Sequence, residues 1–86
     1  MDKTTLFEIE DITNALIETT LDEIYDALKE KGYNPISQIV GYLVSGDPGY
    51  ITNYKNARDK MLGLDRNKVL ELMVRNYLAV SYTNMT

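Results

Sequence analysis

Apolar residues between positions 11 and 31 recur with the spacing of one face of a helix. At about 100° per residue they fall within a single arc, and charged residues fall on the opposite side. The arc holds Leu16, Ile17, Thr20, Leu21, Ile24, Ala27 and Leu28, and the opposite side holds Glu18, Asp22, Asp26 and Lys29. Gly32 follows, and glycine readily adopts the left-handed conformation that ends many helices. The pattern predicts one long amphipathic helix over residues 11–31.

An N-cap residue is followed directly by proline at two places, residues 34–35 and 47–48. Asn and Asp suit the N-cap, and proline suits the first helical position because its nitrogen needs no hydrogen bond there. The first pair predicts a second helix that ends at Ser45-Gly46. The second pair predicts one short helical turn over residues 48–51.

Two further helices are predicted in the rest of the chain. One spans about residues 54–62 and is closed by Gly63, and the other is capped by Asp65 and ends at about Val80. Apart from a short stretch at residues 6–12, no segment shows the strict alternation of a half-buried strand. The helices therefore account for nearly all of the regular structure.

The fold class that follows is all-α, a compact bundle of five helices of which one is very short. With 86 residues, the chain has the length of one small domain. We expect a flexible N-terminal arm at residues 1–11, a single five-helix domain at residues 12–80 and a C-terminal tail at residues 81–86.

The fifth predicted helix has an unusually broad apolar face. Its members are Val69, Leu70, Leu72, Met73, Val74, Tyr77, Leu78 and Val80. They cover an arc of about 240°, which one neighbouring helix cannot cover, and so short a chain has few other elements to wrap it. The pattern favours a homodimer with Val69, Leu72, Met73 and Tyr77 in its interface. The alternative is a monomer whose first and second helices cover the fifth from both sides.

The composition excludes most catalytic chemistry. The chain has no cysteine and no histidine, so the usual ligands of structural zinc, disulfides, thiol nucleophiles and imidazole bases are missing. The acidic residues of the first predicted helix lie on its solvent side, not in a cleft. We therefore expect a protein that is not an enzyme and that holds neither a metal nor a cofactor.

Sequence signals for a membrane or for export are lacking. The longest apolar runs, such as Ile39-Val40, are far shorter than the about 20 residues of a membrane span. The start Met1-Asp2-Lys3 lacks the basic and apolar regions of a signal peptide. We expect a soluble, cytoplasmic protein without stable membrane insertion.

The net charge of −4 is distributed unevenly. Residues 1–28 carry eight acidic side chains against Lys3 alone, whereas residues 48–86 carry six basic side chains against three acidic ones. One interpretation is that an acidic and a basic helix face each other or face water. The other is a basic patch that binds an acidic partner or a phosphate group. The basic patch consists of Lys55, Arg58, Lys60, Arg66 and Lys68.

A helix-turn-helix DNA-binding regulator is the alternative function, because short helices with Gly and Asn turns are typical of that motif. Against it, residues 36–44 contain no basic side chain and the fourth predicted helix contains three. The seven tyrosines lie at helix ends and turns and not between basic residues, which favours packing over base stacking. We expect no nucleic acid partner.

Thr4 and Thr5 lie among acidic residues before the first predicted helix. A Ser/Thr kinase needs an extended, accessible segment, and a terminal arm provides one. The arm is therefore a candidate phosphorylation site. A dimeric scaffold without any switch is the remaining interpretation.

Residues 31–51 follow the pattern KGYNPxxQIVGYLxSGDPxYI. With this motif the chain closely resembles the IreB family of small regulatory phosphoproteins of low-GC Gram-positive bacteria, and weaker similarity covers most of residues 20–78. The resemblance implies a five-helix homodimer that is a substrate of a membrane-anchored PASTA-type Ser/Thr kinase and of its partner phosphatase. It also implies control of peptidoglycan synthesis and of resistance to cell-wall antibiotics, through ClpCP-dependent turnover of the enolpyruvyl transferase that begins the pathway.

The resemblance also suggests which threonine is modified. Family members carry the phosphorylated threonine in the pattern T-x-x-aromatic-x-apolar, which Thr4 fits together with Phe7 and Ile9, while Thr5 is a one-residue-shifted alternative. The leading hypothesis is a phospho-switch in which the unphosphorylated protein engages an effector protein through the basic patch. Phosphate at Thr4 then either occupies the basic patch or repels an acidic partner.

Overall fold

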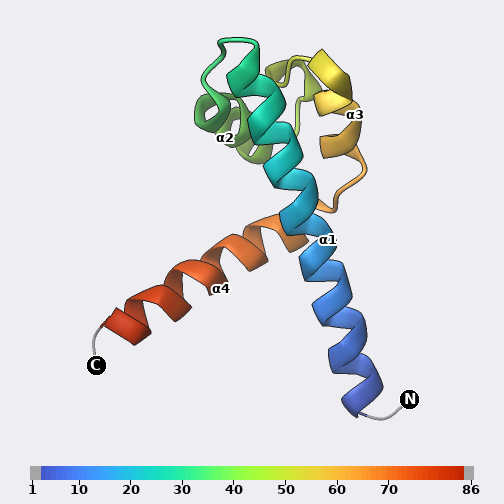
Figure 1. Ribbon diagram of the computed structural model, residues 1–86, viewed down its shortest axis with the longest axis vertical. Coiled ribbons are helices and arrows are strands. Elements are labelled where there is room, and N and C mark those ends of the chain that lie inside the picture. Colours follow the sequence, from blue (N-terminus) through green and yellow to red (C-terminus); the bar gives the residue numbers. More distant parts are fainter. Residues whose placement is uncertain (1–2, 85–86) are drawn as a thin grey trace.

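A computed structural model of the chain describes the backbone of residues 3–84 and the side chains of residues 9–79 (Figure 1). Every regular element within the described residues is helical. The elements are α1 (Lys3–Glu30), α2 (Pro35–Ser45), η1 (Pro48–Tyr50), η2 (Tyr54–Asn56), α3 (Ala57–Leu62) and α4 (Arg66–Asn84). The two η elements are single 3-10 turns. The all-α class is confirmed, with η1 as the very short helix and η2 leading directly into α3.

Figure 1 shows a head from which two helical arms diverge. The elements α2, η1, η2 and α3 pack around the C-terminal half of α1, while the N-terminal half of α1 and the length of α4 point away in different directions. The radius of gyration is 14.6 Å, against about 12 Å for a globular domain of this length. The diverging arms account for the difference.

The hydrophobic core lies in the head and at its junction with α4. Its fully buried side chains are Ile24 and Leu28 of α1, Ile51, Met61 of α3 and Val69 of α4. Around them pack Ile17, Ala27, Ile39, Tyr42, Leu43, Ala57 and Leu72. Removal of this apolar surface from water is the main term that stabilises the fold. Only the first two turns of α4 contribute to the core, through Val69 and Leu72.

The helix ends follow the predicted local signals. Gly32 stands after α1 at φ +88°, in the region that glycine adopts without steric cost. At the start of α2 the Ser37 amide donates a hydrogen bond of 3.1 Å to Asn34 Oδ1. At the start of α4 the Asn67 amide donates one of 2.9 Å to Asp65 Oδ1. These side chains satisfy amides that have no partner inside their helices.

Three helix boundaries differ from the prediction. Helix α3 begins at Ala57, not at about residue 54, because Lys55 and Asn56 have positive φ. Helix α1 begins at Lys3, not at residue 11, so the backbone of residues 3–11 is helical and continuous with the rest of α1. Helix α4 continues to Asn84, past the predicted end at residue 80. Both extensions have the same reason, since neither segment contains a glycine or a proline that would end a helix.

Candidate functional site

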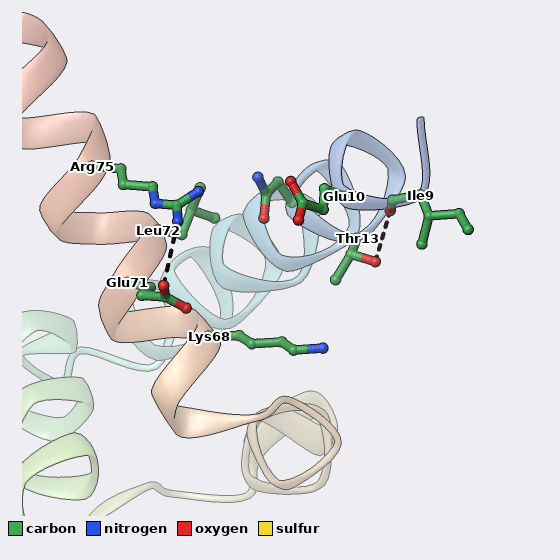
Figure 2. A pocket seen from close by; sticks show the side chains of 8 residues that line it. Ile9, Glu10, Thr13, Lys68, Glu71, Leu72 and Arg75 are labelled. Atoms are coloured by element: carbon green, nitrogen blue, oxygen red, sulfur yellow. Dashed lines mark hydrogen bonds and ion pairs between the residues drawn. The ribbon is translucent and has the colours of Figure 1, made fainter. Parts of the chain in front are cut away.

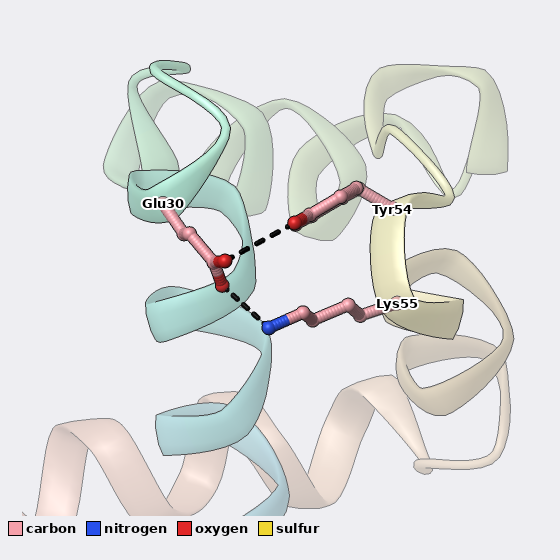
Figure 3. Close-up of polar contacts among 3 residues, drawn as sticks. All are labelled: Glu30, Tyr54 and Lys55. Carbon is pink, nitrogen blue, oxygen red and sulfur yellow. Dashed lines mark hydrogen bonds and ion pairs between the residues drawn. The ribbon is translucent and has the colours of Figure 1, made fainter.

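The acidic side of α1 faces the basic segment formed by η2 and α3. Lys60 Nζ lies 3.1 Å from Glu23 Oε2, and Lys55 Nζ lies 2.6 Å from Glu30 Oε2 (Figure 3). The two carboxylates stand two turns apart on α1 and therefore share one face of the helix. For these two lysines, the interpretation that acidic and basic helices face each other is correct.

The side chain of Arg58 is hydrogen-bonded to the main chain of its own protein. Its Nε donates hydrogen bonds to the carbonyl oxygens of Pro48 at 3.1 Å and Ile51 at 2.8 Å. These bonds tie α3 to the start of η1 and to the residue that follows η1. The expectation that Arg58 presents its charge to a partner does not match this placement, because its Nε is already bonded within the head.

The other members of the basic patch lie on the side of the head where α4 begins. Arg66 Cζ is 5.9 Å from the centroid of the Tyr42 ring, and its guanidinium lies against Gly46. Lys68 is exposed and lies on the face of α4 that looks toward α1. The structure thus divides the five basic residues among separate environments and does not gather them into one surface.

An open cleft of about 340 Å³ separates the diverging α1 and α4 (Figure 2). It is lined by Ile9, Glu10, Thr13 and Asn14 of α1 and by Lys68, Glu71, Leu72 and Arg75 of α4. Arg75 Nη2 pairs with Glu71 Oε1 at 3.4 Å, and Thr13 Oγ1 donates to the Ile9 carbonyl at 3.0 Å. Charges of both signs line the cleft, so it does not offer an ion of one sign a matching site.

Glu30 is the centre of a polar cluster at the C-terminal end of α1. Figure 3 shows the side chains of Tyr54 and Lys55 pointing from η2 toward it. The Tyr54 hydroxyl donates a hydrogen bond of 3.2 Å to Oε1, and the Lys55 ammonium donates to Oε2. The hydrogen bond that Lys55 donates, and after it the one from Tyr54, lowers the pKa of Glu30. The same hydrogen bond to the Glu30 carboxylate raises the pKa of Lys55.

The backbone beside this cluster is strained. Lys55 and Asn56 have φ values of +51° and +63°, in the left-handed region that lysine rarely adopts. Such a conformation persists only where the surrounding structure holds it. Ile51 and Ala57 are fully buried on the two sides of this turn, so packing fixes both of its ends.

Sequence reasoning did not identify Glu30 or Tyr54 as members of a site. The hydrogen bond between them joins residues 24 positions apart, and no local spacing relates the two. The only signal was the opposite charge of the N-terminal and C-terminal parts of the chain, which predicts attraction without naming the partners.

The predicted dimer-interface residues fall into two groups. Val69 and Leu72 are 0% and 6% exposed because they pack in the core of their own chain, so they offer no surface to another copy. Met73 and Tyr77 are 43% and 71% exposed. Leu70, Val74 and Leu78 of α4 are exposed as well. The alternative in which the first and second helices cover the fifth from both sides is therefore wrong for the chain described here.

The N-terminal half of α1 also presents apolar side chains to solvent. Ile9, Ile12 and Leu16 are all exposed. Leu16 was expected on the buried arc, but among the described residues the core extends along α1 only as far as Ile17, so Leu16 lies outside it. Both arms of the molecule thus carry uncovered apolar surface.

Thr4 and Thr5 belong to the helical backbone of α1, and their side chains lie outside the described residues. In the part of the chain that the structure describes, no group of His, Cys, Asp and Glu is arranged to hold a metal ion. No helix there has the length and apolar character needed to cross a membrane.

The helix-turn-helix alternative finds little support in these positions. Helix α3 has six residues, Ala57–Leu62, and two of the three basic residues predicted for it, Lys55 and Lys60, pair with carboxylates of α1. A recognition helix instead needs basic and polar side chains directed outward to a groove.

Residues 2–79 match the family model described as IreB regulatory phosphoprotein. The class of the protein is accordingly that of the small regulatory phosphoproteins. Because the match spans most of the 86 residues, the chain belongs to the IreB family.

Proposed function

We propose that the protein is a cytoplasmic, non-enzymatic phospho-switch that acts by binding other proteins. The observation that carries this proposal is the match of residues 2–79 to the IreB regulatory phosphoproteins. Thr4, or its neighbour Thr5, accepts phosphate from a PASTA-type Ser/Thr kinase and loses it to the partner phosphatase. The output is ClpCP-dependent turnover of the first-step enolpyruvyl transferase, and through it peptidoglycan synthesis and cell-wall antibiotic resistance.

The electrostatics of α1 support a switch by charge. A phosphate adds about −1.5 to −2 charges at neutral pH. It would join Glu10 and Asp11, which are exposed on the same N-terminal half of α1. The added charge strengthens repulsion of an acidic partner and attraction of a basic one.

The effector surface that we propose includes Arg66. Lys55 and Lys60 become part of it when their ion pairs with the carboxylates of α1 break. Both ion pairs are exposed, so the protein loses little stability when a partner replaces a carboxylate. Arg58 is left out of this surface because its hydrogen bonds hold the head together.

We also propose that the protein acts as a homodimer through its two arms. The exposed apolar side chains of α4, with Met73 and Tyr77 among them, and those of α1 support this arrangement. At a twofold axis the same patch of both copies is buried. The apolar area removed from water is therefore twice that of one copy.

The kinase step is tested by incubating the full chain with the cognate kinase and ATP and mapping phosphate by mass spectrometry. We expect Thr4→Ala to remove most of the phosphate while helicity stays unchanged. Thr19→Ala is a matched control on the exposed side of α1 and keeps full labelling. Loss of labelling in Thr5→Ala alone would move the site by one residue, and an unlabelled wild-type chain would contradict the proposal.

A titration with duplex DNA at two salt concentrations separates the switch from the DNA-binding alternative. A protein that acts on other proteins should bind the duplex weakly at both concentrations. Tight binding with a steep salt dependence would favour the DNA-binding regulator, because the release of counterions from phosphates produces that dependence.

A further inference from the structure

The cluster around Glu30 contains more positive than negative charge. Lys31 and Lys55 place their ammonium groups 5.2 and 5.6 Å from the centroid of the Tyr54 ring. Glu30 is the one carboxylate bonded to Tyr54 and Lys55 among the described contacts. Two ammonium groups against one carboxylate leave the cluster with a net charge of about +1 near neutral pH.

The fold fixes the backbone of the segment that carries Tyr54 and Lys55. Lys55 is held in the left-handed region, and the buried Ile51 and Ala57 anchor the segment on both sides. Lys31 follows Glu30 directly in the chain, at the end of α1. The backbone that carries these donors is therefore in place before any ligand arrives, which reduces the ordering cost of binding.

We propose that Lys31, Tyr54 and Lys55 form a receptor for a phosphate monoester, which the carboxylate of Glu30 occupies in the unliganded protein. A phosphate monoester carries about two negative charges and three acceptor oxygens, whereas a carboxylate carries one charge and two oxygens. It therefore matches two ammonium groups and a phenol better than Glu30 does. Lys55 and Glu30 are 57% and 53% exposed, so a ligand reaches them from solvent.

The phosphate cannot come from the arm of the same chain while α1 is helical. Thr4 and Glu30 lie near opposite ends of α1, and a rise of 1.5 Å per residue separates their backbones by about 39 Å. The phosphate group therefore comes from outside the chain that binds it. The arm of a second copy is one source, and there the inference rests on the proposed phospho-switch; free phosphate or an unrelated phosphopeptide is the other.

The test uses the full ¹⁵N-labelled chain and records amide shifts of residues 29–33 and 52–57 during titration. Three probes separate the sources: a phosphothreonine peptide with the sequence of residues 1–11, a scrambled phosphopeptide and inorganic phosphate. We expect saturable shifts with the arm phosphopeptide, weaker ones with the other two and none with the unphosphorylated arm peptide. Equal shifts with all three probes assign the receptor to phosphate in general.

Substitutions test the role of each group. Removing the competing charge by Glu30→Gln should tighten binding about two- to fivefold, as expected for release of an exposed ion pair. Lys55→Gln should abolish saturation, and Tyr54→Phe, which keeps the ring, should weaken binding. Glu71→Gln is the control, because Glu71 is also an exposed carboxylate in an ion pair but lies on α4. It should leave binding unchanged.

Two results would contradict the proposal that this cluster binds phosphate. One is the absence of shifts in these segments with every phosphate probe, and the other is a Glu30→Gln chain, folded by circular dichroism, that binds no tighter than wild type. Kinase labelling of Thr4 together with either result would leave the phospho-switch intact and reject the receptor alone. Binding of the arm phosphopeptide to a chain that the kinase does not label would reject the switch and keep the receptor.

Discussion

The Nε of Arg58 donates a hydrogen bond of 2.8 Å to the main-chain carbonyl oxygen of Ile51. A second bond joins the same nitrogen to the carbonyl oxygen of Pro48 at 3.1 Å. The Pro48 carbonyl also accepts the Ile51 amide at 3.1 Å, whereas the carbonyl of the fully buried Ile51 lies beyond the end of η1 and needs a donor from elsewhere. Arg58 supplies the missing donor from α3.

Replacing Arg58 should therefore destabilise the fold. We expect Arg58→Ala to cost about 1–3 kcal/mol of unfolding free energy, because it leaves two carbonyl groups without their charged donor. Arg58→Lys should recover only part of this, since an ammonium on a flexible stem does not reproduce the planar guanidinium. Urea unfolding followed by circular dichroism measures both. Arg75→Ala, which removes only an exposed ion pair, should change stability by less than about 0.5 kcal/mol, and an equal cost for both alanine variants would contradict the anchoring role.

Gly32 and Gly46 form a matched pair for a second prediction. Both have positive φ, +88° and +75°, but a Cβ at Gly32 meets open space, whereas one at Gly46 clashes with the guanidinium of Arg66. Gly32→Ala should cost about 1–2 kcal/mol from backbone strain alone. Gly46→Ala should cost about 0.5–1 kcal/mol more, because Arg66 must also leave the Tyr42 ring. In an Arg66→Ala background this excess should vanish in thermal or urea unfolding, and its persistence would show that Arg66 is not its cause.

The helix ends could be predicted from sequence because their signals are local. Asn34 and Asp65 bond amides two or three residues away, and Gly32 adopts its positive φ directly after α1. The start of α1 carries no comparable signal, so periodicity located it eight residues too late. The sequence pattern also predicts the helix that carries the broad apolar arc, which is α4. Which part of that arc is buried depends on the direction in which α4 leaves Asp65, and no local pattern encodes that direction.

The candidate site was less accessible to sequence reasoning. Lys55 and Lys60 were identified as basic residues near one another, but their ion-pair partners Glu30 and Glu23 belong to a distant helix. The strained turn at Lys55 and Asn56 contains no glycine, the residue from which a positive φ is usually predicted. Contacts between segments, not properties of one segment, decide whether such charges are presented to a partner or held within the chain.

The ion pair between Glu30 and Lys55 should make a small part of the stability depend on pH. The pKa of Glu30 lies below its ordinary value of 4.5 in the folded chain, mainly through the bond from Lys55. Its contribution is therefore present above pH 4.5 and is lost as pH falls through the lowered pKa. The pKa of Lys55 is raised above 10.5 by Glu30, so its contribution is present below that value and is lost as pH rises through the raised pKa.

Thermal unfolding of the wild type and Glu30→Gln across this range checks the sign. The two melting temperatures should differ near neutral pH and converge in acid, where the wild-type carboxyl is protonated. Added salt should reduce the difference, because both groups are exposed and screened by ions. Carboxyl resonances followed by NMR give the pKa of Glu30 directly, and a value at or above 4.5 would contradict the pairing.

The final prediction concerns the dimer, for which Met73 and Val44 provide a test and its control. Both are apolar and exposed, 43% on α4 and 81% on α2. Burying a large apolar side chain contributes about 1.5–3 kcal/mol, and an unpaired carboxylate in such an interface opposes association strongly. Met73→Asp should therefore sediment as a monomer of 9.8 kDa with unchanged helicity, since its carboxylate is solvated in the single chain. Val44→Asp should keep the mass of the wild-type dimer. A wild type of 9.8 kDa at micromolar concentration, or a dimeric Met73→Asp, would mean that the exposed face of α4 does not join two copies of this chain.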